Sequence, residues 1–181
     1  MVTAPYTYYL PPTEHTPNNS LPVLHYKNVL PLPRTEEETT KLLTAHKWEK
    51  RLLGYMGAIS VSHFHPNTHE CYGIFQGVST LLLGAAGWDG VSNVGLRITV
   101  HTGDVIVLPA GTGHSSVEST DDYRYIGPGC PRWRNEFGKK PIDGKTFRDE
   151  IAGVAYPEED PVYGRDGPLM QLWLHPLGAN L

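Results

Sequence analysis

The pattern of apolar and polar positions is most regular between residues 57 and 126. There, short runs of aliphatic, β-branched and aromatic residues are separated by glycines. The runs read AISVSHFH, ECYGIFQG, VSTLLLG, GLRITVH, DVIVLPAG, SSVES and DYRYIG. Several short strands at this spacing predict an all-β sandwich or barrel rather than alternating strands and helices.

One clear helix pattern precedes this β-rich region. Thr35 followed by Glu38 forms a capping-box pattern, and acidic residues fill the first turn. Leu42, Leu43 and His46 then recur along one helical face. The chain is therefore predicted to consist of an N-terminal arm (1–34), a helix packed on the barrel (35–50), the barrel core (51–128) and a C-terminal extension that packs on the barrel or forms a dimer contact (129–181).

The two ends of the chain differ from the β-rich region in composition and in the pattern of apolar residues. The N-terminal arm is rich in proline and contains one strand-like piece, LPVLHYKNVL. The C-terminal extension has a short helical-turn pattern, KTFRDEIAG, and ends in the apolar GPLMQLWLHPL. We expect that last piece to pack back on the barrel or across a subunit contact, with Tyr163 and Trp173 as core anchors.

Composition restricts the class of partner. The formal net charge is -4, and the sequence has no lysine or arginine cluster of the kind that binds nucleic acid. No segment reaches the roughly 18 apolar residues of a membrane span, and no secretory signal is evident. Cys71 and Cys130 are too few for a disulfide framework, so free thiols are expected. These features predict a cytoplasmic protein with a small-molecule partner, no nucleic acid and no membrane.

The stretch HFHPNTHECYGIFQG, residues 63–77, carries the candidate chemistry. Strand alternation places His63 and His65 on one face with Ile59 and Val61. The opposite face takes Ala58, Ser60, Ser62 and Phe64. Side chains two residues apart on a strand are separated by roughly 6.7 Å, so two imidazoles can reach one ion at about 2.1 Å. His63 and His65 are therefore predicted to form a metal-binding pair.

Further candidate ligands come from the next strand and from a second stretch. Glu70 begins a strand in which Tyr72, Ile74 and Gln76 share its face, so its carboxylate would be a third, anionic ligand. In GDVIVLPAGTGHSS, proline and glycines end one strand and deliver His114 at the start of the next.

The alternative for each histidine is an ordinary buried or surface residue. A single histidine on a half-buried strand is more often hydrogen-bonded than metal-bound. A group of three histidines and a glutamate on inward positions is a different case from a single histidine. Each buried polar group without a partner costs about 1–3 kcal/mol of folding free energy. A bound metal ion would remove that cost.

These motifs resemble the cupin superfamily, whose first motif is G(x)5HxH(x)3-4E(x)6G and whose second is G(x)5PxG(x)2H(x)3N. The first motif is matched at every spacing, by Gly57, His63, His65, Glu70 and Gly77. The second is matched by Gly103, Pro109, Gly111 and His114, with Glu118 where the family pattern has asparagine. Among cupins, the chain is similar to a small YjlB-like group.

The resemblance implies a cupin jelly-roll barrel, also called a double-stranded β-helix. It implies one divalent transition metal, bound by His63, His65, Glu70 and His114. Imidazole and carboxylate ligands suit Fe, Mn, Ni, Co, Cu or Zn, and the ligand types do not choose among these metals. Water or substrate would take the remaining coordination positions.

Residues around the ligands have functional and structural interpretations. Tyr72 and Gln76 either orient a substrate or fill the barrel, and His69 is either a proton shuttle at the cavity mouth or a hydrogen-bonded turn residue. Arg97, in phase with His101, either clamps an anionic substrate or is solvated. Cys71 falls on the phase opposite to Glu70 and is expected to be a packed thiol. The candidate catalytic residues are thus Glu70, Tyr72 and His69.

Three function classes follow from these residues. The first is a metal-dependent enzyme acting on a small oxygenated organic molecule, with dioxygenase chemistry favoured over decarboxylase or isomerase chemistry. The second is a non-catalytic cupin that binds a metal or small ligand. The third is an acid-base isomerase, which would require a His/Asp or His/Tyr pair in the pocket. A homodimer is expected, because exposed strand edges need covering.

Overall fold

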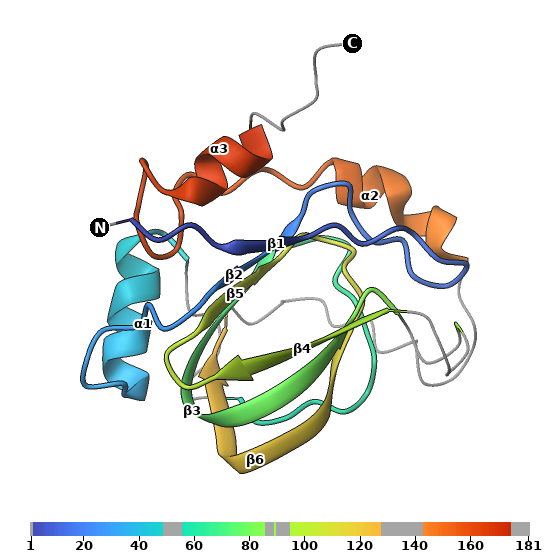
Figure 1. Ribbon diagram of the computed structural model, residues 1–181. Coiled ribbons are helices and arrows are strands. Elements are labelled where there is room, and N and C mark those ends of the chain that lie inside the picture. The colour runs from blue at the N-terminus through green and yellow to red at the C-terminus, as the bar shows by residue number, and fades with distance from the viewer. Residues whose placement is uncertain (1, 49–55, 86–88, 90–94, 128–142, 175–181) are drawn as a thin grey trace.

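A computed structural model describes residues 2–48, 56–85, 89, 95–127 and 143–174. Its core is a six-stranded antiparallel sheet that curls into a half-barrel (Figure 1). The strands are β1 (Tyr6–Tyr8), β2 (Val23–Tyr26), β3 (Glu70–Leu83), β4 (Leu96–His101), β5 (Val105–Leu108) and β6 (His114–Ile126). The helices are α1 (Glu36–Ala45), the 3-10 helix η1 (Gly144–Phe147), α2 (Arg148–Ala152) and α3 (Pro168–Leu174). The all-β class that the sequence predicted is confirmed.

The long strand β3 organises the sheet. Its first part pairs with β5, its second part pairs with β4, and β6 runs along its other edge. The strand changes partners near Gly77, where φ is 74° and the β3/β6 register slips. A Cβ at Gly77 would lie 2.6 Å from the carbonyl oxygen of Thr120, so the bend requires glycine.

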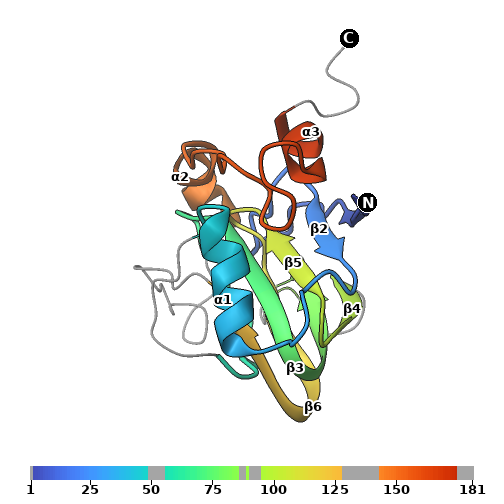
Figure 2. The same ribbon diagram turned by 90° about the vertical axis from the view of Figure 1, so that its left-hand side faces the viewer.

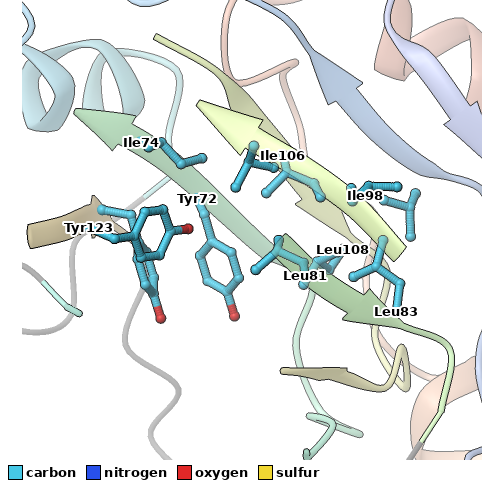
Figure 3. Close-up of a cluster of buried hydrophobic side chains, with 11 residues drawn as sticks. Tyr72, Ile74, Leu81, Leu83, Ile98, Ile106, Leu108 and Tyr123 are labelled. Atoms are coloured by element: carbon cyan, nitrogen blue, oxygen red, sulfur yellow. The ribbon is translucent and has the colours of Figure 1, made fainter. Parts of the chain in front are cut away.

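The slip in register decides which residues of β3 face the barrel interior. Before it, Tyr72 and Ile74 point inward; after it, the odd-numbered Leu81 and Leu83 do. The interior cluster is completed by side chains from β2, β4, β5 and β6, several of which Figure 3 shows directed into the same space. A β-bulge therefore keeps the apolar face continuous although the two-residue alternation is interrupted.

A second apolar cluster covers the outer face of the sheet. Cys71, Val105 and Val107 lie there against Leu43 of α1 and Trp173 of α3. Figure 2 shows α1 lying along the outside of β3. Cys71 is completely buried, as expected for a packed thiol; Cys130 lies outside the described residues.

The helix predicted from the capping pattern is confirmed. The Thr35 side chain accepts a hydrogen bond from the Glu38 N–H at 3.2 Å. The helix α1 begins at Glu36, directly after Thr35. The turn predicted in KTFRDEIAG is confirmed as η1 followed by α2. Residues 168–174 of the apolar tail form a helix, α3, that the sequence pattern did not predict, and its Trp173 is 1% exposed.

Three strand predictions were wrong in detail. The separate strands predicted from ECYGIFQG and VSTLLLG are one strand, β3. Residues 57–65 form no regular strand and meet β6 through an isolated bridge at His63. The predicted alternation therefore fails at Val61, which is 44% exposed, and at Phe64, which is 1% exposed. Phe64 is buried because its face is covered by Phe147, with ring centroids 5.5 Å apart. The separate strands predicted from SSVES and DYRYIG are one bulged strand, β6.

The strand-like piece of the N-terminal arm is a full member of the sheet. β2 pairs with β5 on one side and β1 on the other, and all four of its residues are buried. Figure 1 shows the arm running past α2 and α3 at one end of the half-barrel. Among the described residues, no helix is long and apolar enough to cross a membrane.

Candidate metal centre

His63, His65 and His114 form a buried triad. One nitrogen of each ring lies within 4.8 Å of the others, and the side chains are only 4–6% exposed. The His63 and His114 rings are the closest, with centroids 4.3 Å apart. The triad could hold a metal ion, which is the arrangement that the two sequence motifs predicted.

Backbone pairing brings the two motifs together. The His114 N–H donates to the His63 carbonyl at 2.8 Å, and the His63 N–H donates to the His114 carbonyl at 3.1 Å. This pair is the bridge between residues 57–65 and the start of β6. Two residues more than 50 positions apart in the sequence thus become direct neighbours.

Hydrogen bonds set the tautomers of two of the three rings. His63 Nδ1 lies 2.8 Å from the Val61 carbonyl, and His114 Nδ1 lies 2.9 Å from the Thr112 carbonyl. Because a carbonyl only accepts, each Nδ1 must carry the proton, and each Nε2 presents its lone pair. This is the tautomer in which Nε2 can bind a metal.

Burial keeps all three imidazoles neutral. It lowers the pKa of His63, lowers that of His65 to about 3, and lowers that of His114 well below its usual value. Positive charge on neighbouring histidines would add to the effect at His65 and His114. Neutral imidazole is the form that ligates metal.

Glu70 supplies a carboxylate beside the triad. Its Oε1 lies 3.3 Å from His65 Nε2, and its Oε2 lies 3.4 Å from His114 Nε2. Ligand atoms bound at about 2.1 Å to a common ion are about 3.0–3.4 Å apart at octahedral or tetrahedral angles. Burial raises the pKa of Glu70 to about 8, since the ionised form has little solvation there. The donor set therefore fits a divalent metal ion.

His65 Nδ1 is buried and has no hydrogen-bond partner in the described part of the chain. Because His65 Nε2 is the nitrogen that faces Glu70, an ion bound there would leave Nδ1 unpaired. The cost that a cation would offset is that of burying Glu70 among neutral nitrogen donors.

Tyr72 extends from β3 to the metal ligands. Its hydroxyl lies 3.0 Å from His114 Nε2 and within hydrogen-bonding reach of Glu70. Since His114 Nδ1 holds that ring's proton, the Tyr72 hydroxyl donates to Nε2. Burial, followed by the nearby Glu70 charge, raises the pKa of Tyr72 well above its usual value, so the hydroxyl stays protonated.

A small cavity adjoins the triad. It leaves about 20 Å³ for the centre of a water molecule, which is room for about one water. Its walls are formed by Ile59, His63, Tyr72, Leu81, His114, Ser115, Ser116, Tyr123 and Tyr125. Three tyrosines therefore face the space next to two of the candidate ligands.

His69 is not among the residues that line this cavity. It is 8% exposed, and its Nδ1 accepts a hydrogen bond from the Ala110 N–H at 3.0 Å. Burial lowers the pKa of His69 to about 4. Its ring centroid lies 4.8 Å from that of Trp173.

Other candidates lie away from the centre. Arg97 and His101 are exposed on β4, so the structure favours the solvated interpretation of Arg97. Gln76 is half-buried near the bend of β3 and does not line the cavity.

Sequence reasoning missed two features of the interior. Tyr123 and Tyr125 reach the cavity from β6; their alternation in DYRYIG was the available signal. His25 and Asp104 form a buried pair, with His25 Nε2 and Asp104 Oδ2 2.8 Å apart. His25 comes from the N-terminal arm, so no local spacing could reveal the pair. Neither residue lines the cavity.

Comparisons with known proteins give one extended similarity. No family model matches the chain. The chain is 28% identical over 171 residues to the uncharacterized protein YjlB of Bacillus subtilis (strain 168), covering 93% of this chain and 96% of that protein. A solved structure, a DUF861 family protein from Thermotoga maritima, is 20% identical with a TM-score of 0.34, covering 58% of this chain and 96% of that one.

Proposed function

We propose that this cupin-like homologue of YjlB binds one divalent transition-metal ion and uses it to act on a small oxygenated organic molecule. The observation that carries the proposal is the buried triad of His63, His65 and His114 with the Glu70 carboxylate 3.3–3.4 Å from two of its nitrogens. Burial of four such groups is unfavourable unless a cation compensates for it.

The ion would be held by the Nε2 atoms of His63 and His114, by His65 and by Glu70. When bound, it would act as a Lewis acid toward an oxygen of the substrate. The donor set suits Fe, Mn, Ni, Co, Cu or Zn.

The chain's own residues would orient the substrate. The Tyr72 hydroxyl donates a hydrogen bond to His114 Nε2, the atom that would bind the metal. With His114 Nε2 held as a metal ligand, the Tyr72 hydroxyl would be free to donate to Glu70 or to a substrate oxygen in the cavity. Tyr123 and Tyr125 line the same cavity, and burial raises the pKa of each tyrosine above the usual value. All three tyrosines would therefore be uncharged hydrogen-bond donors.

We favour dioxygenase chemistry over decarboxylase or isomerase chemistry on a small enol, diketone or catechol. The alternative is a non-catalytic cupin that holds a metal or a small ligand. That alternative is supported by the size of the cavity, which has room for about one water. An organic substrate would have to displace side chains such as Ile59 or Tyr125. For an acid-base isomerase, the His25–Asp104 pair does not line the cavity. The His/Tyr pair that does, Tyr72 with His114, uses a histidine that the proposal assigns to the metal.

Metal binding is tested first. Protein purified without chelators is expected to contain about one transition-metal ion per chain by elemental analysis. His65→Ala should remove it, because the variant loses one of four ligands. His101→Ala is the matched control, since His101 is an exposed histidine of β4. Equal metal content in wild type and His65→Ala would contradict the proposed centre.

Tyr72→Phe separates metal binding from substrate handling. The variant loses the hydroxyl that occupies His114 Nε2 in the absence of metal, so its metal affinity should equal or exceed that of wild type. Turnover or ligand binding should fall by about 10- to 1,000-fold if the hydroxyl contacts the reacting oxygen. A variant with weaker metal binding would mean that Tyr72 supports the centre and does not compete with it.

The reaction is tested by oxygen consumption. Wild-type protein loaded with iron(II) is supplied with a panel of enols, diketones and catechols. Consumption that requires both the metal and one substrate class supports a dioxygenase. No oxygen consumption with any compound or metal, together with a small ligand that co-purifies and is recovered unchanged, supports the non-catalytic binding function.

A further inference from the structure

His69 is a buried histidine that neither contacts the cavity nor belongs to the metal-binding triad. It stands immediately before Glu70 at the start of β3. One face of its ring contacts Trp173, whose indole N–H donates to the Pro22 carbonyl at 3.0 Å. The ring is thus fixed between the barrel and α3.

The hydrogen bond of His69 crosses to the loop that carries His114. Its Nδ1 accepts the Ala110 N–H, and Ala110 is itself 1% exposed. Ala110 directly precedes Gly111, whose positive φ of 84° turns the chain toward His114. A Cβ at Gly111 would lie 2.5 Å from Ile151 Cδ1, so the loop is packed tightly against α2.

Four hydrogen bonds connect this loop to the segment that supplies the other ligands. Three are backbone bonds: Gly111 N–H to the His65 carbonyl at 2.8 Å, and the two reciprocal bonds between His63 and His114. The fourth is the bond to His69. Because it is made by a side chain, it depends on which residue occupies position 69.

We infer that His69 is a positioning residue of the proposed metal centre, whose bond to Ala110 sets the distance between Glu70 and His114. His69 directly precedes Glu70 in the chain, and its hydrogen-bond partner Ala110 lies four positions before His114. Trp173 holds the ring in the required orientation, so α3 takes part in building the centre. This inference rests on the proposed metal binding.

The two variants that test the inference differ in one property. In His69→Asn, Oδ1 replaces Nδ1 at the same distance from the backbone and can accept the Ala110 N–H. In His69→Leu, a side chain of similar size has no acceptor, and the Ala110 N–H remains buried without a partner. The pair thus separates hydrogen bonding from bulk.

The experiment measures cobalt(II) binding to the full-length protein by titration, together with the visible spectrum of the bound ion. His69→Leu is expected to weaken binding by about 10- to 100-fold and to change the spectrum, as loss of groups that orient ligands commonly does. His69→Asn should retain the wild-type spectrum, with an affinity within about threefold of wild type. Amide hydrogen exchange at Ala110 should be slow in wild type and His69→Asn but faster in His69→Leu.

Leu43→Ala is the control for general destabilisation. Leu43 belongs to the same outer cluster as Trp173 but lies on α1. It should lower thermal stability and leave cobalt affinity unchanged. If affinity instead falls with stability in all variants, or if His69→Leu and His69→Asn bind alike, the positioning role is wrong.

Two further outcomes are separable. Wild-type protein that binds no cobalt overturns the metal proposal and this inference with it, whereas wild-type binding with an unaffected His69→Leu overturns the inference alone. If His69→Leu does not fold, His69→Ala takes its place, and the same comparison with His69→Asn decides the question.

Discussion

Two buried carboxylates of this protein have opposite surroundings. Asp160 is fully buried, and its two oxygens accept four hydrogen bonds, from the Tyr26 hydroxyl at 2.6 Å and from the N–H groups of Val162, Tyr163 and Leu169 at 2.8–3.0 Å. Glu70 is similarly buried, but its oxygens face the nitrogens of His65 and His114, and burial raises its pKa to about 8.

The difference separates a structural carboxylate from a candidate ligand. Four well-placed donors replace the water that Asp160 loses on burial, so its charge is satisfied by the fold itself. Glu70 faces imidazole nitrogens that burial keeps neutral, and it lacks a comparable set of backbone donors among the hydrogen bonds found. A metal ion would provide Glu70 with what the hydrogen bonds provide for Asp160.

Asp160→Asn is expected to have the largest effect on stability. The amide keeps one acceptor oxygen but turns an NH2 group toward backbone N–H donors, which should reduce the free energy of unfolding by about 3 kcal/mol. Urea unfolding measures the change. Asp166→Asn is the matched control, because Asp166 is exposed in the same segment. A loss no greater than in the control would mean that the Asp160 bonds contribute little.

Asp104 is a second buried carboxylate that accepts several hydrogen bonds, and its contribution to stability should depend on pH. Its burial opposes ionisation, but hydrogen bonds from His25, from the Asn28 N–H and from the His101 N–H outweigh burial and lower the pKa of Asp104. A lowered folded-state pKa gives stability that is present above the unfolded value, about 3.9, and lost as the pH falls through the folded value.

Asp104→Asn should therefore destabilise the protein by about 2 kcal/mol at pH 7. The gap between wild type and variant should narrow as the pH falls below about 4. Unfolding free energies measured across pH 3–7 check this. A gap of constant size would show that the ionised form of Asp104 is not what the hydrogen bonds stabilise.

Glu70→Gln should change the stability of the metal-free protein least, by less than about 1 kcal/mol, because the amide keeps the shape of a carboxyl group that its raised pKa already leaves mainly uncharged at neutral pH. Its effect should emerge with metal. An ion at 100 times its dissociation constant stabilises wild type by about 2.7 kcal/mol, and at the same concentration the variant should gain less. Thermal unfolding with and without metal checks both statements. A strongly destabilised metal-free variant would place Glu70 in the same class as Asp160.

Local sequence signals predicted much of the fold and of the centre. Fixed spacings gave His63, His65, Glu70 and His114 as candidates, because strand alternation and glycine-rich turns act over a few residues. The Thr35 cap was readable for the same reason. Residues 57–65 were misread as a regular strand because their apolar alternation resembles one, although their one bridge to β6 is at His63.

By itself, the sequence determined the all-β class, the start of α1 and the residue types available for a metal, since each depends on neighbours along the chain. Tertiary structure decided the rest. Only folding brings the His63 and His114 backbones into a hydrogen-bonded pair, places Tyr125 of β6 beside the centre, and sets the Trp173 ring against His69. These contacts join residues that are far apart in the chain, and their energies depend on burial and on hydrogen-bond partners that no local pattern encodes.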